Sequence, residues 1–205
     1  MKKELILAGV LLLSAVSYGQ KKEIKKAEKA VNSGNYTEAM GYLSEAEGLL
    51  ESADSGVKSQ FYLVKGKALM ASAGSDVGKM KLASEAFAMA KEVDVEGKNT
   101  RAINNEKQAL KTSLESGAAS DYKAKNYKMA ANKFYTAYSL SPADTLFLFN
   151  AALSSKIGND FDNAESYFLK LSDLGYTGMQ KQFMAVSKET GLEEPFVSKS
   201  SRDLM

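Results

Sequence analysis

Two short patterns in this chain place nucleophilic or phosphate-binding side chains at spacings that enzymes use. Ser55 stands three residues before Lys58, the spacing of nucleophile and lysine in penicillin-binding enzymes, but the companion Ser-Asp-Asn is missing. The run from Gly74 to Lys79 approaches a phosphate-binding loop, which needs one more residue between its glycines and a hydroxyl after its lysine. Met80 stands where that magnesium-binding hydroxyl is required. Neither pattern therefore predicts a catalytic site.

A third group, Asp160, Asp162 and Glu165, gathers carboxylates but lacks the loop and glycine of an EF-hand calcium site. We interpret these residues as favourable negative charge at the start of a helix. The chain contains no histidine and no cysteine, which excludes imidazole and thiolate metal sites, disulfides, cysteine nucleophiles and histidine bases. Since no pair of carboxylates is singled out either, we expect a protein that is not an enzyme and has no cofactor or metal.

The composition favours helix and argues against nucleic acid as a partner. Of the 205 residues, 44% are hydrophobic, enough for one substantial core, and only two are prolines. The formal net charge is only +2, and Arg101 and Arg202 are the only arginines, so bidentate recognition of phosphate or guanine has few donors. We therefore expect an all-α protein that does not bind nucleic acid.

A motif of a polar residue, an aromatic, two variable residues and an alanine recurs along the chain. Its clearest copies are Asn35-Tyr36-Thr37-Glu38-Ala39, Asn126-Tyr127-Lys128-Met129-Ala130 and Asp160-Phe161-Asp162-Asn163-Ala164. A large apolar residue follows each alanine four positions later, and Ala83 with Phe87 supplies a further copy. The alanines at 39, 83, 130 and 164 are 44, 47 and 34 residues apart, so the first two steps imply inserted loops or longer helices.

Each copy has a small residue upstream that can face its alanine across two antiparallel helices. These small residues are Ala27, Gly66, Ala118 and Ala152. We predict that Gly66 and Ala152 lie at close helix crossings, with the following aromatic filling the space beside the contact. Residues 72–78 of the second copy are predicted to form an inserted loop.

The turns between paired helices carry residues typical of helix ends. Gly34 and Gly158 suit the left-handed ending of a helix. Asn35, Asn126 and Asp160 can accept hydrogen bonds from the free amides at the start of the next helix.

These repeats resemble the tetratricopeptide repeat (TPR) family over residues 20–177, most closely in the last two copies. The resemblance implies about four stacked antiparallel helical hairpins, a TPR-like α-solenoid in a right-handed superhelix whose concave surface holds a protein or peptide partner. The alternative is an ordinary helical bundle with a coincidental alanine pattern.

The resemblance implies that the inner side of each hairpin's first helix binds the partner. By spacing, the inner positions are Gln60, Leu63, Lys67 and Met70, then Thr112, Glu115, Ala119 and Tyr122, then Leu146, Phe149, Leu153 and Lys156. We predict that Lys67, Met70, Tyr122, Phe149 and Lys156 contact the partner, with aromatics as anchors and lysines as steering charges. The alternative is that further helices cover some of them, Phe149 and Leu153 especially.

The amino-terminus has the pattern of a secretory signal peptide over residues 1–19. Lys2 and Lys3 precede an apolar run at residues 5–16, and Ser17-Tyr18-Gly19 offers small residues where a signal peptidase reads. We expect cleavage after Gly19 and export to the periplasm or outer envelope of a Gram-negative bacterium. The alternatives are an uncleaved anchor or a buried first helix. No later stretch is long and apolar enough to span a membrane.

The last segment, residues 178–205, is predicted to hold an extra helix at 179–190 ending at Gly191, a break at Pro195 and a helix start after residue 198. These elements either begin further repeats or form a disordered tail. We expect no β-sheet in the chain.

Three functions from different classes fit these observations. The leading one is a non-enzymatic scaffold in the cell envelope that binds a protein or peptide on its concave surface. The second is an exported sensor or regulatory region of a longer protein whose effector or membrane domain is absent from this chain. The third is an enzyme or glycan-binding protein built on helical repeats. Neither the partner nor the oligomeric state follows from the sequence.

Overall fold

The structure is a computed structural model that describes residues 19–178, 183–186, 191 and 193–196. The chain divides into two units, residues 1–168 and 169–205, which are described separately below. Eight α-helical segments lie in the described residues, which confirms the all-α prediction of at least eight helices.

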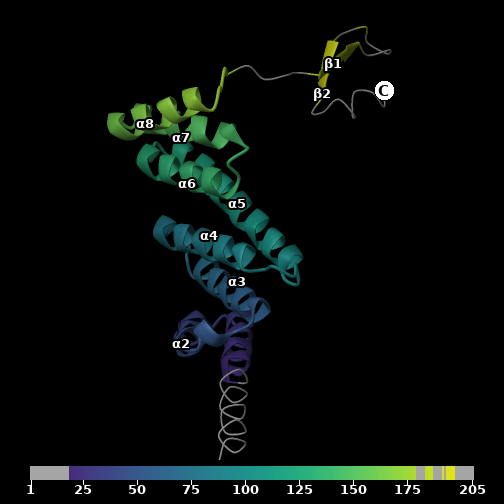
Figure 1. The fold of residues 1–205 in the computed structure, drawn as a ribbon. Helices are drawn as coiled ribbons and strands as arrows, with labels where there is room; N and C mark the ends of the chain where they lie inside the picture. The colour runs from purple at the N-terminus through teal and green to yellow at the C-terminus, as the bar shows by residue number, and fades with distance from the viewer. Residues whose placement is uncertain (1–18, 179–182, 187–190, 192, 197–205) are drawn as a thin grey trace, which may run out of the picture. The chain divides into compact units, whose positions relative to one another are not determined.

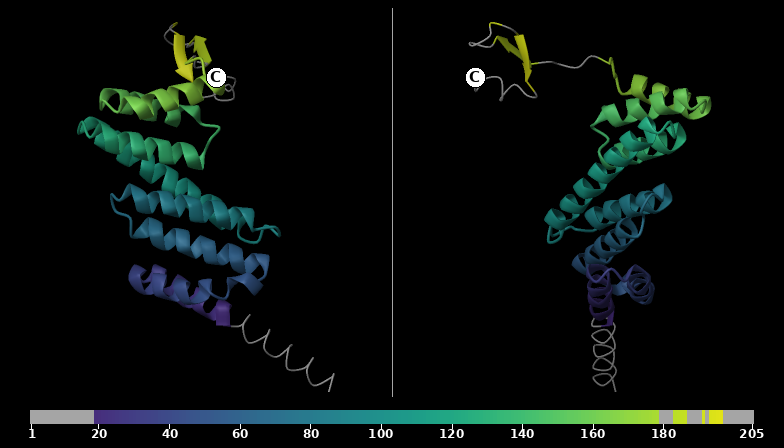
Figure 2. Two further views of the ribbon diagram at one scale, coloured as in Figure 1. Left: turned by 60° about the vertical axis from the view of Figure 1, so that its left-hand side comes forward. Right: turned by 180° about the vertical axis from the view of Figure 1, so that it is seen from behind.

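The helices of the first unit follow one another in chain order, and successive helices turn back on each other (Figures 1 and 2). After a helical segment at residues 19–32 come α2 (Tyr36–Glu47), the 3-10 helix η1 (Leu50–Ser52), α3 (Ser55–Ala71), α4 (Val77–Glu92), α5 (Thr100–Lys123), α6 (Tyr127–Leu140), α7 (Thr145–Ile157) and α8 (Phe161–Asp173). The boundary between the two units falls within α8. This arrangement of consecutive helical hairpins is that of an α-solenoid, as predicted.

Small residues let paired helices approach closely, as the repeat pattern predicts. Ala27, Ala118, Ala152, Ala39 and Ala83 are all fully buried. In the second hairpin, a Cβ placed on Gly66 of α3 would lie only 2.6 Å from Cδ1 of Phe87 on α4. The ring of Phe87 therefore occupies the space that the missing side chain leaves.

The same backbone turn ends three helices of the first unit. At the first turn, the amide of Asn35 donates to the carbonyl of Ala30 at 2.8 Å, and the amide of Gly34 donates to Val31 at 3.0 Å. These two bonds form a Schellman motif, which needs a left-handed residue after the helix. Equivalent bonds recur at residues 125–126 and 159–160, so the repeats share backbone geometry as well as side-chain pattern.

Among these three turns of the first unit, the left-handed residue is glycine only in the first one. Gly34 has φ +78°, as predicted, whereas Lys125 and Asn159 hold φ +64° and +60° in the later copies. The prediction for Gly158 is wrong, because its φ is −79°. A Cβ on Gly158 would lie 3.0 Å from Cβ of Tyr127, so glycine is needed there for the approach of two helices.

Aspartates cap the starts of helices more often than the predicted asparagines. The side chains of Asn35 and Asn126 make no capping bond. Asp160 accepts a long bond of 3.4 Å from the amide of Asn163. The closest cap belongs to Asp54, which accepts from Val57 at 2.8 Å, and Asp76 caps α4 in the same way at 3.1 Å.

The long second step of the repeat contains both a loop and a longer helix. Residues 93–99 connect α4 to α5, and α5 is 24 residues long, against 13 for α7. The small residue Ala118 lies near its carboxyl end, so the additional residues extend the helix at its amino end. The loop predicted at 72–78 is shorter in the structure, because α4 already begins at Val77.

The second unit contains a hairpin of two short strands. β1 (Phe183–Val186) pairs antiparallel with β2 (Glu193–Phe196), with Phe183 opposite Phe196. The predictions of a helix over residues 179–190 and of no β-sheet are therefore wrong at these described positions. Four apolar residues in a row have no periodicity that separates helix from strand. Gly191, with φ +70°, lies between the two strands in the sequence. The helix start expected after residue 198 lies outside the described residues.

Within the described part of the chain, no helix combines the length and the apolar character that a membrane crossing requires. The signal peptide predicted for residues 1–19 lies outside the described residues apart from Gly19.

Candidate protein-binding surface

The predicted inner positions form one row of side chains on α5 and another on α7, called the inner rows below. Most of these side chains are accessible to solvent. On α5, Thr112, Glu115 and Ala119 are exposed, and Tyr122 is half-buried. On α7, Leu146 and Lys156 are exposed, and Phe149 and Leu153 are half-buried. Helical spacing places each row on one side of its helix, so both rows present side chains to solvent.

An aromatic contact at the end of α5 orients Tyr122. Its ring meets the ring of Tyr127, the first residue of α6, edge to face with a centroid distance of 5.3 Å. The Schellman turn at residues 125–126 fixes the geometry between the two helices. Tyr122 is therefore a half-exposed aromatic whose orientation is set before any partner binds.

Phe149 has a similar arrangement on α7. Its ring meets that of Phe168 on α8 at 6.4 Å, also close to edge-on, and Phe168 is itself 37% exposed. Phe149 and Leu153 are both half-buried, and α8 contacts the ring of Phe149, so part of this row is covered by the next helix. Lys156 is exposed in the last turn of α7, where a cation interacts favourably with the helix dipole.

The inner row of α3 differs, because the amino-terminal half of α5 lies against it. Nζ of Lys67 is 3.9 Å from Oε1 of Glu106, and each side chain is only 26% exposed. Leu63, which was expected to line an open groove, is 4% exposed, and Ile103 of α5 is completely buried. Met70 is half-buried in the last turn of α3. Part of this predicted surface is thus occupied by the chain's own extended helix.

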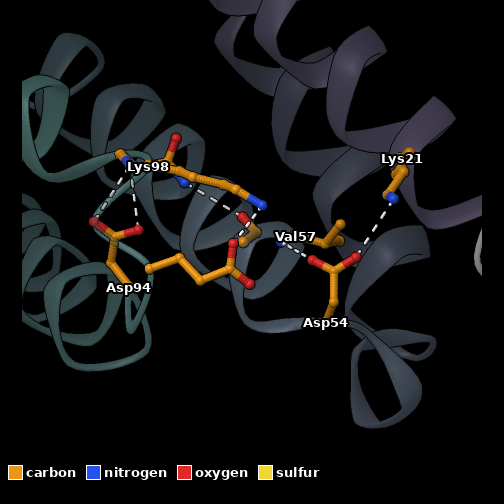
Figure 3. A network of polar contacts seen from close by, with 8 residues as sticks. Lys21, Asp54, Val57, Asp94 and Lys98 are labelled. Atoms are coloured by element: carbon orange, nitrogen blue, oxygen red, sulfur yellow. Dashed lines mark hydrogen bonds and ion pairs between the residues drawn. The ribbon is translucent and has the colours of Figure 1, made fainter.

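Asp94 organises the loop that leads into α5 (Figure 3). Its carboxylate accepts hydrogen bonds from the amide of Asn99 at 3.2 Å and from Oγ1 of Thr100 at 2.7 Å. Nδ2 of Asn99 in turn donates to the carbonyl of Gly56 at 3.3 Å, which ties the loop to the first turn of α3. Burial raises the pKa of Asp94, but the bonds from Thr100 and Asn99, with nearby Lys91, outweigh it and lower the pKa overall.

Asp54, the residue before α3, also holds neighbouring segments together (Figure 3). It accepts from the amide of Val57 at the start of α3, and Nζ of Lys21 lies 3.4 Å from its Oδ2. The bond from Val57 is the main reason that the pKa of Asp54 is lowered, and Lys21 adds to the effect. The two aspartates therefore link residues 19–32, α3 and the start of α5.

The five predicted residues do not form one cluster. Lys67 pairs with Glu106, which is sixteen residues before Tyr122 on the same helix. At 1.5 Å of rise per residue, about 24 Å separates them along α5. Lys67 and Met70 therefore lie with the extension of α5, whereas Tyr122, Phe149 and Lys156 belong to the last two hairpins.

Sequence reasoning missed an ion pair that holds α5 to α6. Nζ of Lys133 lies 2.7 Å from Oδ2 of Asp121, close enough for an ion pair although the angle is not that of a hydrogen bond. Lys133 is only 6% exposed. A Cβ on Gly117 would be 3.1 Å from the same Nζ, so glycine makes room for the lysine. In the sequence, only the glycine at residue 117 indicated that another side chain could pack closely against α5 at this position.

A shallow hollow of about 380 Å³ lies between α4 and α6, and it contains none of the five predicted residues. Its lining includes Ser84, Glu85, Asn132, Tyr135 and Thr136. Among the described residues, no group of three or more acidic side chains is placed to hold a metal ion.

Comparisons with protein-family models, with curated proteins and with solved structures found no match to this chain.

Proposed function

We propose that this protein is a non-enzymatic scaffold of the TPR type that binds a protein or peptide on the inner rows of α5 and α7. The observation that carries this proposal is the pair of half-exposed, oriented aromatics, Tyr122 and Phe149, on the first helices of neighbouring hairpins.

Large aromatics in partly desolvated positions supply most of the binding energy at many protein interfaces. Both rings are already held by edge-to-face contacts, so binding would cost little additional side-chain conformational entropy. Lys156 adds an exposed positive charge on α7, which favours a partner with acidic groups.

The proposed surface is narrower than the full inner row of a regular array. Leu63 on α3 is only 4% exposed, and Glu106 of α5 partly neutralises Lys67. We assign Lys67 and Met70 a secondary role at the edge of the interface, and the main contacts to the last two hairpins.

The proposal includes export to the envelope of a Gram-negative bacterium, supported by the apolar run at residues 5–16 and the small residues before Gln20. Determining the amino-terminal sequence of the protein in cell fractions tests it. A mature chain that begins at Gln20 in the periplasmic or membrane fraction is expected, and a chain that begins at Met1 in the cytoplasm contradicts export.

Binding is tested by affinity capture from envelope extract with a tagged chain, followed by mass spectrometry. The proposal expects one protein to be enriched by the native chain and to be lost when both aromatics are truncated. Enrichment that is equal for both chains contradicts the assignment of this surface.

A further inference from the structure

The hollow between α4 and α6 is separate from the surface proposed above for a protein partner. It measures about 380 Å³, which is within the range of small-molecule sites, about 300–1,000 Å³. Its lining includes Lys81, Ser84 and Glu85 of α4 and Asn132, Tyr135 and Thr136 of α6. Since α4 and α6 are the second helices of their hairpins, a ligand here would not occupy the inner rows of α5 and α7.

Ser84 brings a hydroxyl to the hollow that the protein itself does not satisfy. The residue is only 8% exposed, and its Oγ has no hydrogen-bond partner in the described part of the chain. Thr136 and Ser139 differ, because each donates to the carbonyl four residues earlier, the usual bond of a helical hydroxyl. A buried hydroxyl without a partner costs free energy, so a ligand that completes this bond gains affinity.

Asn132 supplies a second unsatisfied group, from α6. Its side chain is exposed and makes no hydrogen bond to any described residue. A carboxamide both donates and accepts, and so does the hydroxyl of Ser84. Ser84 and Asn132 therefore match ligand groups that can also donate and accept, as alcohol hydroxyls do.

Tyr135 adds a fixed aromatic surface beside these polar groups. Its ring stacks on the ring of Tyr167, with a centroid distance of 4.6 Å and an interplanar angle of 16°, and Tyr167 is only 9% exposed. One face of the Tyr135 ring is therefore covered, and the remaining surface of the ring borders the hollow. The face of an aromatic ring is electron-rich and attracts C–H groups that carry partial positive charge.

The charges around the hollow compensate each other. Nζ of Lys81 lies 4.0 Å from Oε1 of Glu85, and both side chains are exposed. Among the described residues that line the hollow, no other is charged. The lining therefore favours a neutral ligand over an anion or a cation.

We propose that the hollow binds one sugar ring of a neutral saccharide. A pyranose ring combines C–H groups on its faces with hydroxyl groups around its edge, and each hydroxyl both donates and accepts. In the hollow the C–H face would lie on Tyr135, and the hydroxyls would bond to Ser84 and Asn132. A peptide fits less well, because peptides are usually anchored by a large side chain in a well-packed pocket and this hollow is shallow.

The test titrates the full chain with maltotetraose, xylotetraose and N-acetylchitotetraose, and follows binding by calorimetry and NMR. We expect one or more of these saccharides to bind and to shift the amide resonances of residues 81–85 and 132–136. The affinity should not change with salt, because the ligand is uncharged.

The variant Ser84→Ala/Asn132→Ala removes both unsatisfied groups. It should weaken saccharide binding by roughly 10-fold or more, because a ligand hydroxyl loses a partner at each position. Its stability should not fall, since neither side chain gives up a hydrogen bond within the described residues. This combination separates a ligand-binding role from a structural one. Tyr135→Ala should also abolish binding, whereas Tyr135→Phe keeps the ring and should retain most of the affinity.

The matched control is Asn105→Ala/Ser155→Ala. Ser155 is another buried serine whose Oγ has no partner, and Asn105 is an exposed asparagine of α5; neither lines the hollow. This variant should bind as the native chain does. Absence of binding to all three saccharides, full binding by the Ser84 and Asn132 variant, or an equal loss in the control would overturn the proposal. Loss of the captured protein partner by the Ser84 and Asn132 variant would assign the hollow to a peptide and overturn it as well.

Discussion

The ring of Phe87 lies against the backbone of Gly66, so closely that a Cβ at residue 66 would be 2.6 Å from its Cδ1. Both residues are buried, and Phe87 is fully inaccessible to solvent. Neither the ring nor the glycine can move without separating α3 from α4. The contact therefore sets the distance between the two helices of the second hairpin.

We predict that Gly66→Ala destabilises the protein although alanine favours helix. Overpacking costs about 1–3 kcal/mol, and the gain in helix propensity is about 1 kcal/mol, so the net loss should be about 1 kcal/mol. Gly41→Ala is the matched control, because Gly41 is also within a helix and a Cβ there meets nothing within 4 Å. Urea denaturation should show a lower midpoint for the first variant and a higher one for the second.

The left-handed conformation of Lys125 gives a second prediction. Its φ of +64° is unfavourable for a residue with a side chain, whereas glycine adopts it freely. Lys125→Gly should stabilise the protein by about 1 kcal/mol. Lys107→Gly, within α5, should instead cost about 1 kcal/mol. Thermal unfolding that moves in the same direction for both variants would show that the turn does not strain Lys125.

The pair of Lys133 and Asp121 gives a third prediction. Lys133→Met removes a buried cation and leaves the largely buried Asp121 without its partner, 2.7 Å away in the native chain. We expect a loss of about 2 kcal/mol, less than for a fully buried pair because Asp121 keeps 20% of its surface exposed. Adding Asp121→Asn to this variant should recover part of the loss in urea denaturation. If the double variant is less stable than the single one, the ion pair is not the cause.

The lowered pKa of Asp94 makes stability depend on pH. Burial opposes its ionisation, but the bonds from Thr100 and Asn99 and the charge of Lys91 favour the carboxylate in the folded state. Its stabilising contribution is therefore complete above the unfolded pKa, near 3.8, and is lost as the pH falls through the lower folded value.

Asp94→Asn should consequently lower the melting temperature at pH 7 and have a smaller effect at pH 3. Glu92→Gln is the control, since Glu92 is an exposed acid two residues away. A melting temperature that falls equally at both pH values would mean that the carboxylate charge of Asp94 does not stabilise the loop.

The parts of the fold that follow from local spacing were predictable. Gly66 and Phe87 meet because both occupy fixed positions relative to the repeat, and one helical period determines which side each faces. The long step from Ala83 to Ala130 indicated inserted residues, but it did not indicate which helices they would pack against. The pair of Lys67 and Glu106 therefore depends on where α5 packs, which the sequence around Lys67 does not contain.

The turns and the last segment show two other reasons for failure. Gly158 serves the approach of Tyr127, and the left-handed position belongs to Asn159, so the type of residue alone did not identify its role. Four apolar residues at β1 (Phe183–Val186) fit a helix or a strand equally well. In both cases, a residue or strand distant in the sequence determines the local structure.

The last prediction tests the binding surface itself. Tyr122→Ala/Phe149→Ala should remain helical but lose its captured partner, because truncating a central aromatic often costs at least about 2 kcal/mol of binding free energy. Circular dichroism must be measured with the binding, since both rings also contact neighbouring helices.

The control Tyr36→Ala/Phe161→Ala removes two aromatics from the first residues of α2 and α8, outside the predicted inner rows. This control variant should keep the partner, because it leaves α5 and α7 unchanged. If the Tyr122 and Phe149 double variant is folded and binds as the native chain does, the inner rows of α5 and α7 are not the interface. The hollow between α4 and α6 would then be the next surface to alter, starting with Asn132 on its α6 side.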